Sequence, residues 1–416
     1  MPNVEAFNLP FGEAISFFRQ KVQLPTKTWK DLWKGMHARA FMVAGAAKTQ
    51  LLSDFYDAVE KGIAKGTTLA EFRKDFDDIV ARHGWKYKGG KGWRTGIIFN
   101  TNIKTAYAAG QHKQMTDPVI LAARPYWRYV ASSSKEKRPE HMQWYNLVLP
   151  AGDPWWKTHR PPNGWGCKCG VVNHSAREVE RLKKEEGKGP NPVKITAPET
   201  KYYQWEDKAT GKIHNIPEGI DPGWDYNVGE AAWGNRLSEE TMNTWRTQGA
   251  NAYERLTAGA WETYGRPKMI PADTPKAKTG EKLKTTDATE AALKKILGGD
   301  EKIFSFQNKG FRYDVLVNAA TVARHMDLER SAFLPFITES MEDPYEIWLS
   351  FEKHKGTGKI FLRQRIIKAI KLDKVRSLLI TTQAINGVME AWTILPTTKF
   401  DYINKQREGS LIWARE

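Results

Sequence analysis

Apolar residues in the first 115 positions recur every three or four residues, the spacing that places them on one face of a helix. The longest such stretch predicts a helix over 29–66, capped by Thr28 and ended by Gly66. One stripe of it would consist of Leu32, Met36, Ala40 and Val43. Further helices are predicted over 10–21, 69–83 and 94–115. A threonine before 69–83 and a glycine after it mark its ends. The pattern therefore predicts a mostly helical N-terminal region, residues 1–115.

From residue 116 the helical period gives way to a sequence rich in tryptophan, proline and glycine. The expected elements are a strand over 123–134, a charged helix over 176–187, a hairpin early in 200–235 and a helix over 240–259. An irregular middle domain, 116–265, is the interpretation. Residues 266–284 are Pro- and Lys-rich with few apolar side chains, which predicts a linker.

Residues 285–416 alternate helical and strand patterns. Helices are predicted over 288–299, 321–344 and 398–408, and strands over 311–318, 346–353, 359–370, 377–385 and 388–396. Asn386-Gly387 lies between the last two strands, a strong signal for a tight hairpin. Antiparallel strands with helices at the ends favour an α+β domain over a doubly wound sheet. The whole chain is thus predicted to be a multidomain α+β protein.

Length and composition support several folded domains. The chain has 416 residues, more than one ordinary core accommodates, and 40% of them are hydrophobic. No apolar run reaches the roughly 18 residues of a membrane helix, and the N-terminus lacks the features of a signal peptide. We therefore expect a soluble protein, made in a cytoplasm, without a membrane partner. Two cysteines in all exclude a disulfide-stapled secreted scaffold.

The net charge of +16 is spread along the chain rather than gathered in one arm. Such an excess favours contact with polyanions, of which nucleic acid is the commonest. The alternative is that a basic sequence only keeps the protein in solution.

Cys167 and Cys169 form the clearest metal-binding pattern, because His141, His159 and His174 lie nearby in the sequence. Thiolates and imidazoles are the ligands of structural zinc sites. One residue between the cysteines makes a tighter chelate than the usual two. The set leaves two interpretations open: two buried thiols that pack as small hydrophobes, or a structural zinc held by Cys167, Cys169, His141 and His159.

Two other segments allow a nucleic-acid or nucleotide interpretation. Three tryptophans stand beside basic residues and could stack on bases, although such clusters more often form a core or a protein–protein anchor. These residues are Trp155, Trp156, Trp165, Lys157, His159, Arg160 and Lys168. Residues 356–359, Gly-Thr-Gly-Lys, lack the spacing of a phosphate-binding loop and are followed by a strand, so a tight turn is predicted.

The C-terminal domain carries a possible catalytic set. His325 lies on a predicted helix, and Arg363 and Arg365 share one face of a strand by alternation. Thr381 and Thr393 lie on the two arms of the predicted hairpin. A two-residue turn would place Thr381 opposite Trp392 and Thr393 opposite Ile380, so that the two hydroxyls point to opposite faces. Arg407 follows the last helix.

Four segments resemble the Mu F-like family of phage head-morphogenesis proteins. They are AISFFRQKVQLPTKTW, GTTLAEFRKDF with GWRTGIIFNTNIKTAYAAGQ after it, PPNGWGCKC, and IPEGIDPGWDYN. The resemblance covers about 11–235. It implies a minor capsid protein located in the virion near the portal, with portal, capsid proteins and phage DNA as partners. The family pattern also includes Arg-Pro-Glu-His, which makes His141 the first imidazole candidate.

Residues 285–416 resemble the phage branch of the barnase–EndoU–colicin–RelE (BECR) ribonucleases, in their order of elements and in HMDLERSAFLPFI and DPYEIW. This implies an effector that cleaves host RNA without a metal or another cofactor. Such cleavage needs a group that takes the 2′-hydroxyl proton, an acid for the leaving oxygen and cations for the phosphate, which histidine and arginine supply. The alternative is a catalytically inactive binding module in a purely structural head protein, with each candidate an ordinary surface or strand residue.

Overall fold

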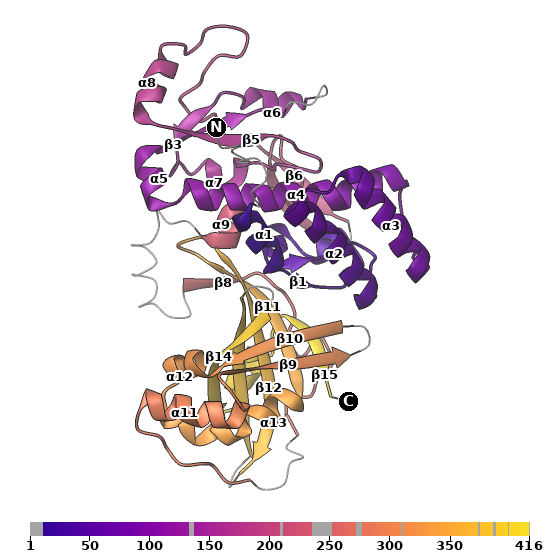
Figure 1. The fold of residues 1–416 in the computed structure, drawn as a ribbon, viewed down its shortest axis with the longest axis vertical. Coiled ribbons are helices and arrows are strands. Elements are labelled where there is room, and N and C mark those ends of the chain that lie inside the picture. Colours follow the sequence, from indigo (N-terminus) through magenta and orange to yellow (C-terminus); the bar gives the residue numbers. More distant parts are fainter. Residues whose placement is uncertain are drawn as a thin grey trace, which may run out of the picture. The chain divides into compact units, whose positions relative to one another are not determined.

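The computed structural model describes residues 11–132, 137–208, 211–234, 252–271, 277–308, 311–372, 375–385, 388–397 and 399–415. The chain forms two compact units (Figure 1). The N-terminal unit comprises Met1–Arg19, Gln23–Ala252 and Lys355–Ile360. The C-terminal unit comprises Gln20–Val22, Tyr253–His354 and Phe361–Glu416. The predicted multidomain α+β fold is confirmed.

The N-terminal unit begins with a helical layer. Its helices are α1 (Gly12–Arg19), α2 (Thr49–Lys65), α3 (Leu69–His83) and α4 (Lys91–Met115), and α4 contacts the other three. The side chain of Thr68 accepts the Glu71 N–H at the start of α3, and Glu71 in turn accepts the Thr68 N–H. Gly66 and Gly84 end α2 and α3 in the left-handed conformation. These helix ends are as predicted.

The first half of the predicted helix 29–66 is wrong. Residues 29–48 form two short 3-10 turns, η1 (Trp29–Asp31) and η2 (Lys34–Ala38), and the strand β2 (Ala40–Phe41), which pairs with β1 (Val22–Gln23). The reason is tertiary packing, which outweighs helix propensity. Buried Arg39 donates to the carbonyls of Ala232 and Ile360, and Trp33 stacks on Trp205. Neither arrangement is available to a continuous helix.

The middle of the chain is a small sheet surrounded by short elements. The sheet has the order β4 (Val148–Pro150), β3 (Tyr126–Val130), β5 (Gly170–His174). The short helices around it are α5 (Pro118–Ala123), α6 (Pro139–Gln143), α7 (Trp156–His159), α8 (Ala176–Lys183) and α9 (Val228–Trp233). The predicted hairpin is β6 (Tyr202–Asp207) with β7 (Lys212–Pro217). Its core is mostly aromatic and includes Trp127, Tyr129, Trp144, Trp155 and Trp156.

Most of the predicted helix 240–259 lies outside the described residues, and its last part is wrong. Tyr253–Arg255 instead forms strand β8, which pairs with β11 in the C-terminal unit. Within the range predicted as a linker, Ile270 is buried and Arg266 pairs with Glu346 of the same unit. Among the described helices, none combines the length and apolarity needed to cross a bilayer.

The C-terminal unit is one large sheet with a helical layer (Figure 1). Its strands are β9 (Glu301–Asn308), β10 (Phe311–Asn318), β11 (Glu346–His354), β12 (Ile360–Lys371), β13 (Val375–Ile385), β14 (Val388–Thr397) and β15 (Ser410–Ala414). They run in the order β15-β11-β12-β13-β14-β10-β9, and β10 is parallel to β14. A turn, not a phosphate-binding loop before a helix, joins β11 to β12, as predicted.

The helices of this unit are α11 (Thr286–Leu297), α12 (Ala319–His325), α13 (Ile337–Glu342) and α14 (Phe400–Gln406). The predicted single helix 321–344 is broken, because the 3-10 segment η5 (Leu328–Phe336), with Pro335 inside it, separates α12 from α13. Helices α11, α12 and α13 form one layer through their contacts with each other and with η5. Buried Lys368 of β12 pairs with Glu339 of α13, so this layer covers the sheet face to which Lys368 points.

Candidate functional site

Three segments that are far apart in the sequence meet beside the small sheet. The guanidinium of Arg138 donates to both carboxylate oxygens of Asp221, at 3.0 and 3.1 Å, and to the carbonyl of Trp165 at 2.8 Å. Asp221 also accepts the Trp165 N–H at 2.7 Å. The Asp221 N–H donates to the carbonyl of Asn163, whose side chain accepts the Tyr129 hydroxyl. Residues of Arg-Pro-Glu-His, PPNGWGCKC and IPEGIDPGW therefore build one structure.

Gly164 is required by this packing. A Cβ atom there would lie 2.3 Å from the Asp221 carboxylate and 2.5 Å from the Arg138 guanidinium. Contacts this short would force the ion pair apart. Glycine in PPNGWG thus lets the loop pass directly under the Arg138–Asp221 pair.

The loop held in this way presents two thiols to an imidazole. The Nδ1 atom of His141, in α6, lies 3.5 Å from the Sγ of Cys169 and 3.7 Å from the Sγ of Cys167. The three donor atoms all lie within 4.8 Å of one another. His141 Nε2 is 2.9 Å from the carbonyl of Gly219, which can only accept, so Nε2 carries the proton and Nδ1 has the free lone pair. Three of the predicted ligands, two thiols and one imidazole, thus lie together, and both cysteines are free thiols.

The two thiols have opposite acid–base character. The hydrogen bond from Cys167 lowers the pKa of Cys169 to about 4. The same hydrogen bond, together with burial, raises the pKa of Cys167.

The other predicted imidazoles are not part of the group. His159, predicted as a ligand, stacks on Trp155 at 4.4 Å, and its Nδ1 atom is 2.8 Å from the Thr158 hydroxyl. Burial lowers the pKa of His159 to about 4. His174 lies near Glu178 of α8 instead. Within the described residues, the group of His, Cys, Asp and Glu donors is limited to His141, Cys167 and Cys169.

The tryptophan cluster of the middle domain is mostly core. Trp155 and Trp156 are buried, and Arg160 is fully buried with its guanidinium 4.5 Å from the ring of Trp127. Half-buried Trp165 packs edge-on against Trp224. Lys157 and Lys168 are exposed. Trp155 and Trp156 are therefore not available as a base-stacking surface, because both rings are buried in the domain.

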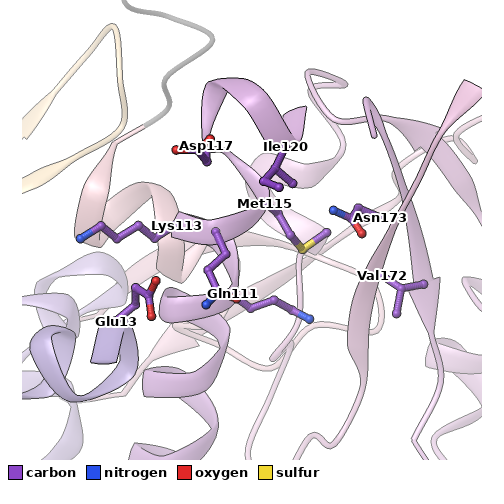
Figure 2. A pocket seen from close by; sticks show the side chains of 9 residues that line it. Glu13, Gln111, Lys113, Met115, Asp117, Ile120, Val172 and Asn173 are labelled. Atoms are coloured by element: carbon purple, nitrogen blue, oxygen red, sulfur yellow. The ribbon is translucent and has the colours of Figure 1, made fainter. Parts of the chain in front are cut away.

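A separate pocket of about 600 Å³ opens on the N-terminal unit, between α4 and β5 (Figure 2). It is lined by Glu13, Gln111, Lys113, Gln114, Met115, Asp117, Ile120, Val172 and Asn173. Figure 2 shows Met115 and Gln111 of α4 on one side and Val172 and Asn173 of β5 on the other. The lining mixes apolar and polar groups without a cluster of catalytic type.

In the C-terminal unit the predicted arginine pair is confirmed to share a face of β12. Arg363 Nε lies 2.7 Å and Arg365 Nη2 2.6 Å from the two carboxylate oxygens of Glu352 in β11. Buried Arg365 also donates to Ser350 and Gln406, and burial lowers its pKa. Arg363 keeps part of its side chain exposed. Of the two, Arg363 is therefore the one that a phosphate can reach.

Arg407 is committed to the fold. Its side chain is fully buried, and it donates to both oxygens of Glu346, at 2.6 and 2.7 Å. It also donates to the Pro267 carbonyl and to Asn404. A substrate phosphate cannot displace these partners without opening the core, so this geometry favours a structural role over the predicted catalytic one.

The predicted register of the two threonines is wrong. Thr381 pairs directly with Thr393, while Thr382 pairs with Ala391, because an irregularity in the ladder leaves Trp392 without a partner. Arg365 pairs with Thr381 on its other side, so Arg365, Thr381 and Thr393 form one cross-strand row. The threonine side chains themselves lie outside the described residues.

His325 belongs to the opposite side of the sheet. Its backbone ends α12, which is part of the layer on the Lys368 face, and its side chain lies outside the described residues. Arg363 and Arg365 alternate with Lys368 along β12 and so belong to the other face. The structure therefore does not bring His325 and the arginine pair together.

Sequence reasoning missed Glu352, His354 and Tyr253. His354 follows Glu352 by two positions in β11, hence on the same face. Tyr253 pairs with His354 across β8 and β11, its ring is 5.2 Å from the imidazole, and the guanidinium of Arg363 lies 4.9 Å from the same ring. The alternation in EIWLSFEKH was the available signal. The pairing of His354 with Tyr253 could not be predicted from the sequence, because a helix was expected at Tyr253.

Comparison with known proteins agrees with both resemblances. Residues 53–172 match the family described as Phage Mu protein F like protein, and residues 289–414 match the family described as phage-Barnase-EndoU-ColicinE5/D-RelE like nuclease2. No solved structure matches the chain.

Two relatives align with this chain over a longer stretch than either family model matches. Protein F of Escherichia phage Mu, named for a role in capsid assembly, is 32% identical over 253 residues, 55% of this chain and 56% of the relative. The Mu-like prophage FluMu F protein of Haemophilus influenzae is 32% identical over 234 residues, 50% and 54% of the two chains. The chain thus spans about half the length of the relatives it matches. The two resemblances predicted from the sequence are confirmed: one part of the chain matches the phage Mu protein F like family, and another part matches the phage BECR-like nuclease family.

Proposed function

We propose that this protein is a minor head protein of a tailed double-stranded DNA phage or prophage, made in the bacterial cytoplasm and incorporated into the virion. The match of residues 53–172 to the Mu F-like family supports this most directly. The relative from Escherichia phage Mu, named for capsid assembly, supports it further. Portal and capsid proteins are the proposed partners, and the net charge of +16 suits a position next to packaged DNA.

Mass spectrometry of gradient-purified, nuclease-treated virions tests the head role. We expect peptides from both units in mature particles, and co-purification of an affinity-tagged chain with the portal. A host protein of similar size and charge, added to the lysate, controls for adsorption to particles. Particles that contain portal and major capsid protein but never this chain would contradict the proposal.

We further propose that the C-terminal unit cleaves RNA, because residues 289–414 match a nuclease-like family. The exposed part of Arg363, with Glu352, His354 and Tyr253 around it, is the arrangement that suits this chemistry best. Glu352 accepts from both arginines and so fixes the direction of the Arg363 guanidinium. His354 lies beside it, and histidine is the side chain that most often acts as a general acid or base.

In the proposed reaction the 2′-oxygen attacks the phosphorus and the bond to the 5′-oxygen breaks. The proton of the 2′-hydroxyl passes to the imidazole of His354, and the 5′-oxygen takes up a proton from solvent. The products are a 2′,3′-cyclic phosphate and a 5′-hydroxyl, with no net gain or loss of atoms. Arg363 stabilises the charge that develops on the phosphate oxygens.

Incubation of the purified full chain with total RNA in EDTA tests this function. A positioned proton-transfer group contributes about 10²- to 10⁴-fold, so His354→Ala should slow cleavage by that order. His325→Ala tests whether His325 of α12, a catalytic candidate from the sequence, takes part in cleavage. We expect this variant to retain activity. Arg363→Ala should also lose activity, whereas Lys295→Ala, an exposed charge on α11, is the matched control. If folded wild-type protein leaves RNA intact, the unit is instead an inactive binding module.

A further inference from the structure

In the group formed by His141, Cys167 and Cys169, the first two residues are buried and Cys169 is half-buried against the aromatic core. His141 stacks on Trp144. Two thiols near a single imidazole lone pair are difficult to explain as hydrogen bonding alone. Only one S–H group can donate to Nδ1, yet both sulfur atoms lie at nearly the same distance from it.

The distances agree with a shared metal ion. A tetrahedral zinc with Zn–S of about 2.3 Å and Zn–N of about 2.0–2.1 Å separates its sulfur and nitrogen ligands by roughly 3.5–3.6 Å. The two observed S···N separations are 3.5 and 3.7 Å. The three donors therefore already stand at about the spacing of a zinc coordination shell.

The surroundings of His141 support the same conclusion. Metal-bound histidines usually donate their second N–H to a carbonyl or carboxylate, which fixes the ring and the tautomer. Here that acceptor is the carbonyl of Gly219, which leaves Nδ1 unprotonated and directed at the thiols. Gly219 adopts a left-handed φ of 83°, and a Cβ there would lie 2.9 Å from Trp144. Glycine thus lets this carbonyl approach the imidazole.

We propose that His141 Nδ1 and the thiolates of Cys167 and Cys169 bind one zinc ion, with a role in holding the fold. Two thiolates cancel the charge of Zn²⁺, so the bound group is neutral and suits a buried site. Zinc sites are usually four-coordinate, and a water molecule would complete a shell that has three donors among the described residues.

The ion would join two of the three converging segments directly and the third through a hydrogen bond. His141 comes from α6, the cysteines come from the PPNGWGCKC loop, and Gly219 follows β7. The loop from Asn163 to Cys169 forms neither helix nor strand, so side-chain and metal contacts must maintain its shape. This inference does not depend on the proposed head or nuclease functions.

Metal analysis of the full chain, purified without chelator, is the first test. We expect about one zinc per chain, and a thiolate-to-metal absorption band after exchange for Co²⁺. The chain has two cysteines in all, so every thiolate signal must come from this group. Cys167→Ser with Cys169→Ser should abolish both signals. His174→Asn, at a nearby histidine outside the group, is the matched control and should keep both.

A measurement on the wild-type protein covers the case in which the variants do not fold. Titration with an organomercurial, which binds thiolates, should release the zinc completely at two equivalents per chain, as followed with a zinc-sensitive dye. Wild-type protein that contains no zinc and takes none up, or zinc that remains bound after both thiols are blocked, would overturn the proposal.

Discussion

Glu346 and Arg407 have side chains with no exposed surface, yet both are charged groups. The two hydrogen bonds between them offset the cost of removing both charges from water, since an unpaired buried charge costs several kcal/mol. Histidines meet the same demand by staying neutral. His159 and His112 are both buried, and burial is the main cause that lowers the pKa of each.

This gives the N-terminal unit a defined pH response. His159 titrates near pH 4 in the folded state and near 6.5 when unfolded, so the unfolded chain takes up its proton first as the pH falls. Its contribution is fully present above about pH 6.5 and is lost towards pH 4. Between pH 7 and pH 5 the loss should be about 2 kcal/mol in the free energy of unfolding.

His159→Phe tests this pH response, because phenylalanine keeps the stack on Trp155 but cannot be protonated. Urea unfolding followed by tryptophan fluorescence at several pH values should show a smaller loss of stability in acid for the variant than for the wild type. His112 shifts in the same direction, so some acid sensitivity should remain. Parallel pH curves for the two proteins would mean that His159 is not the group responsible.

At the scale of elements, local signals were predictable and tertiary ones were not. The caps at Thr68 and Gly84 act within one turn of helix, and the structure has both. The stretch 29–48 has a helical period as well, but Arg39 and Trp33 have their partners far along the sequence, at Ala232 and Ile360 for Arg39 and at Trp205 for Trp33. No periodicity contains that information.

The register of the β13–β14 hairpin was predictable only near its turn. A two-residue turn fixes the pairing at its own end, and Ile385 does pair with Val388. One irregularity further along, beside Trp392, then shifts the ladder by a residue and changes every face assignment beyond it. Thr381 and Thr393 become direct partners for this reason. Alternation alone could not predict where the extra residue is inserted.

The candidate sites also contain residues that the sequence identifies and residues that only the structure identifies. Residue type and spacing selected Cys167, Cys169 and His141, and these three donors lie together in the structure. They also selected His159, because it lies near the cysteines in the sequence. In the structure His159 instead stacks on Trp155 in the aromatic core. The supporting carbonyl of Gly219 has no chemical signature in the sequence. In the nuclease-like unit, Glu352 could be found only after β11 was known to neighbour β12.

At the scale of the whole molecule, two family matches fall in two compact units. The main segment of the C-terminal unit nevertheless begins before its family match, at Tyr253. β8 extends the large sheet beside β11, and Trp261 and Ile270 pack on a core cluster with Trp348 and Ile403. Residues that look like a linker by composition thus supply part of the core of this unit.

A fragment that starts at residue 276 should therefore be much less stable than one that starts at 253. The shorter fragment lacks β8, the apolar contacts of Trp261 and Ile270, and the 2.8 Å ion pair from Arg266 to buried Glu346. Loss of one large buried apolar side chain typically costs 2–5 kcal/mol. Leaving a buried carboxylate with one of its two cationic partners removed adds to this.

Thermal melts of the two fragments at equal concentration would measure the difference, with full-length protein as the reference. We expect a cooperative transition for 253–416 and a transition at least 10 °C lower, or none, for 276–416, because 1 kcal/mol shifts the melting temperature of a domain of this size by about 2–4 °C or more. Ile270→Ala in the longer fragment should fall between them. If 276–416 melted as high as 253–416, the segment 253–271 would be a tether and not part of the fold. Any nuclease assay on an isolated domain should then use the longer fragment, since Tyr253 also contacts His354 and Arg363.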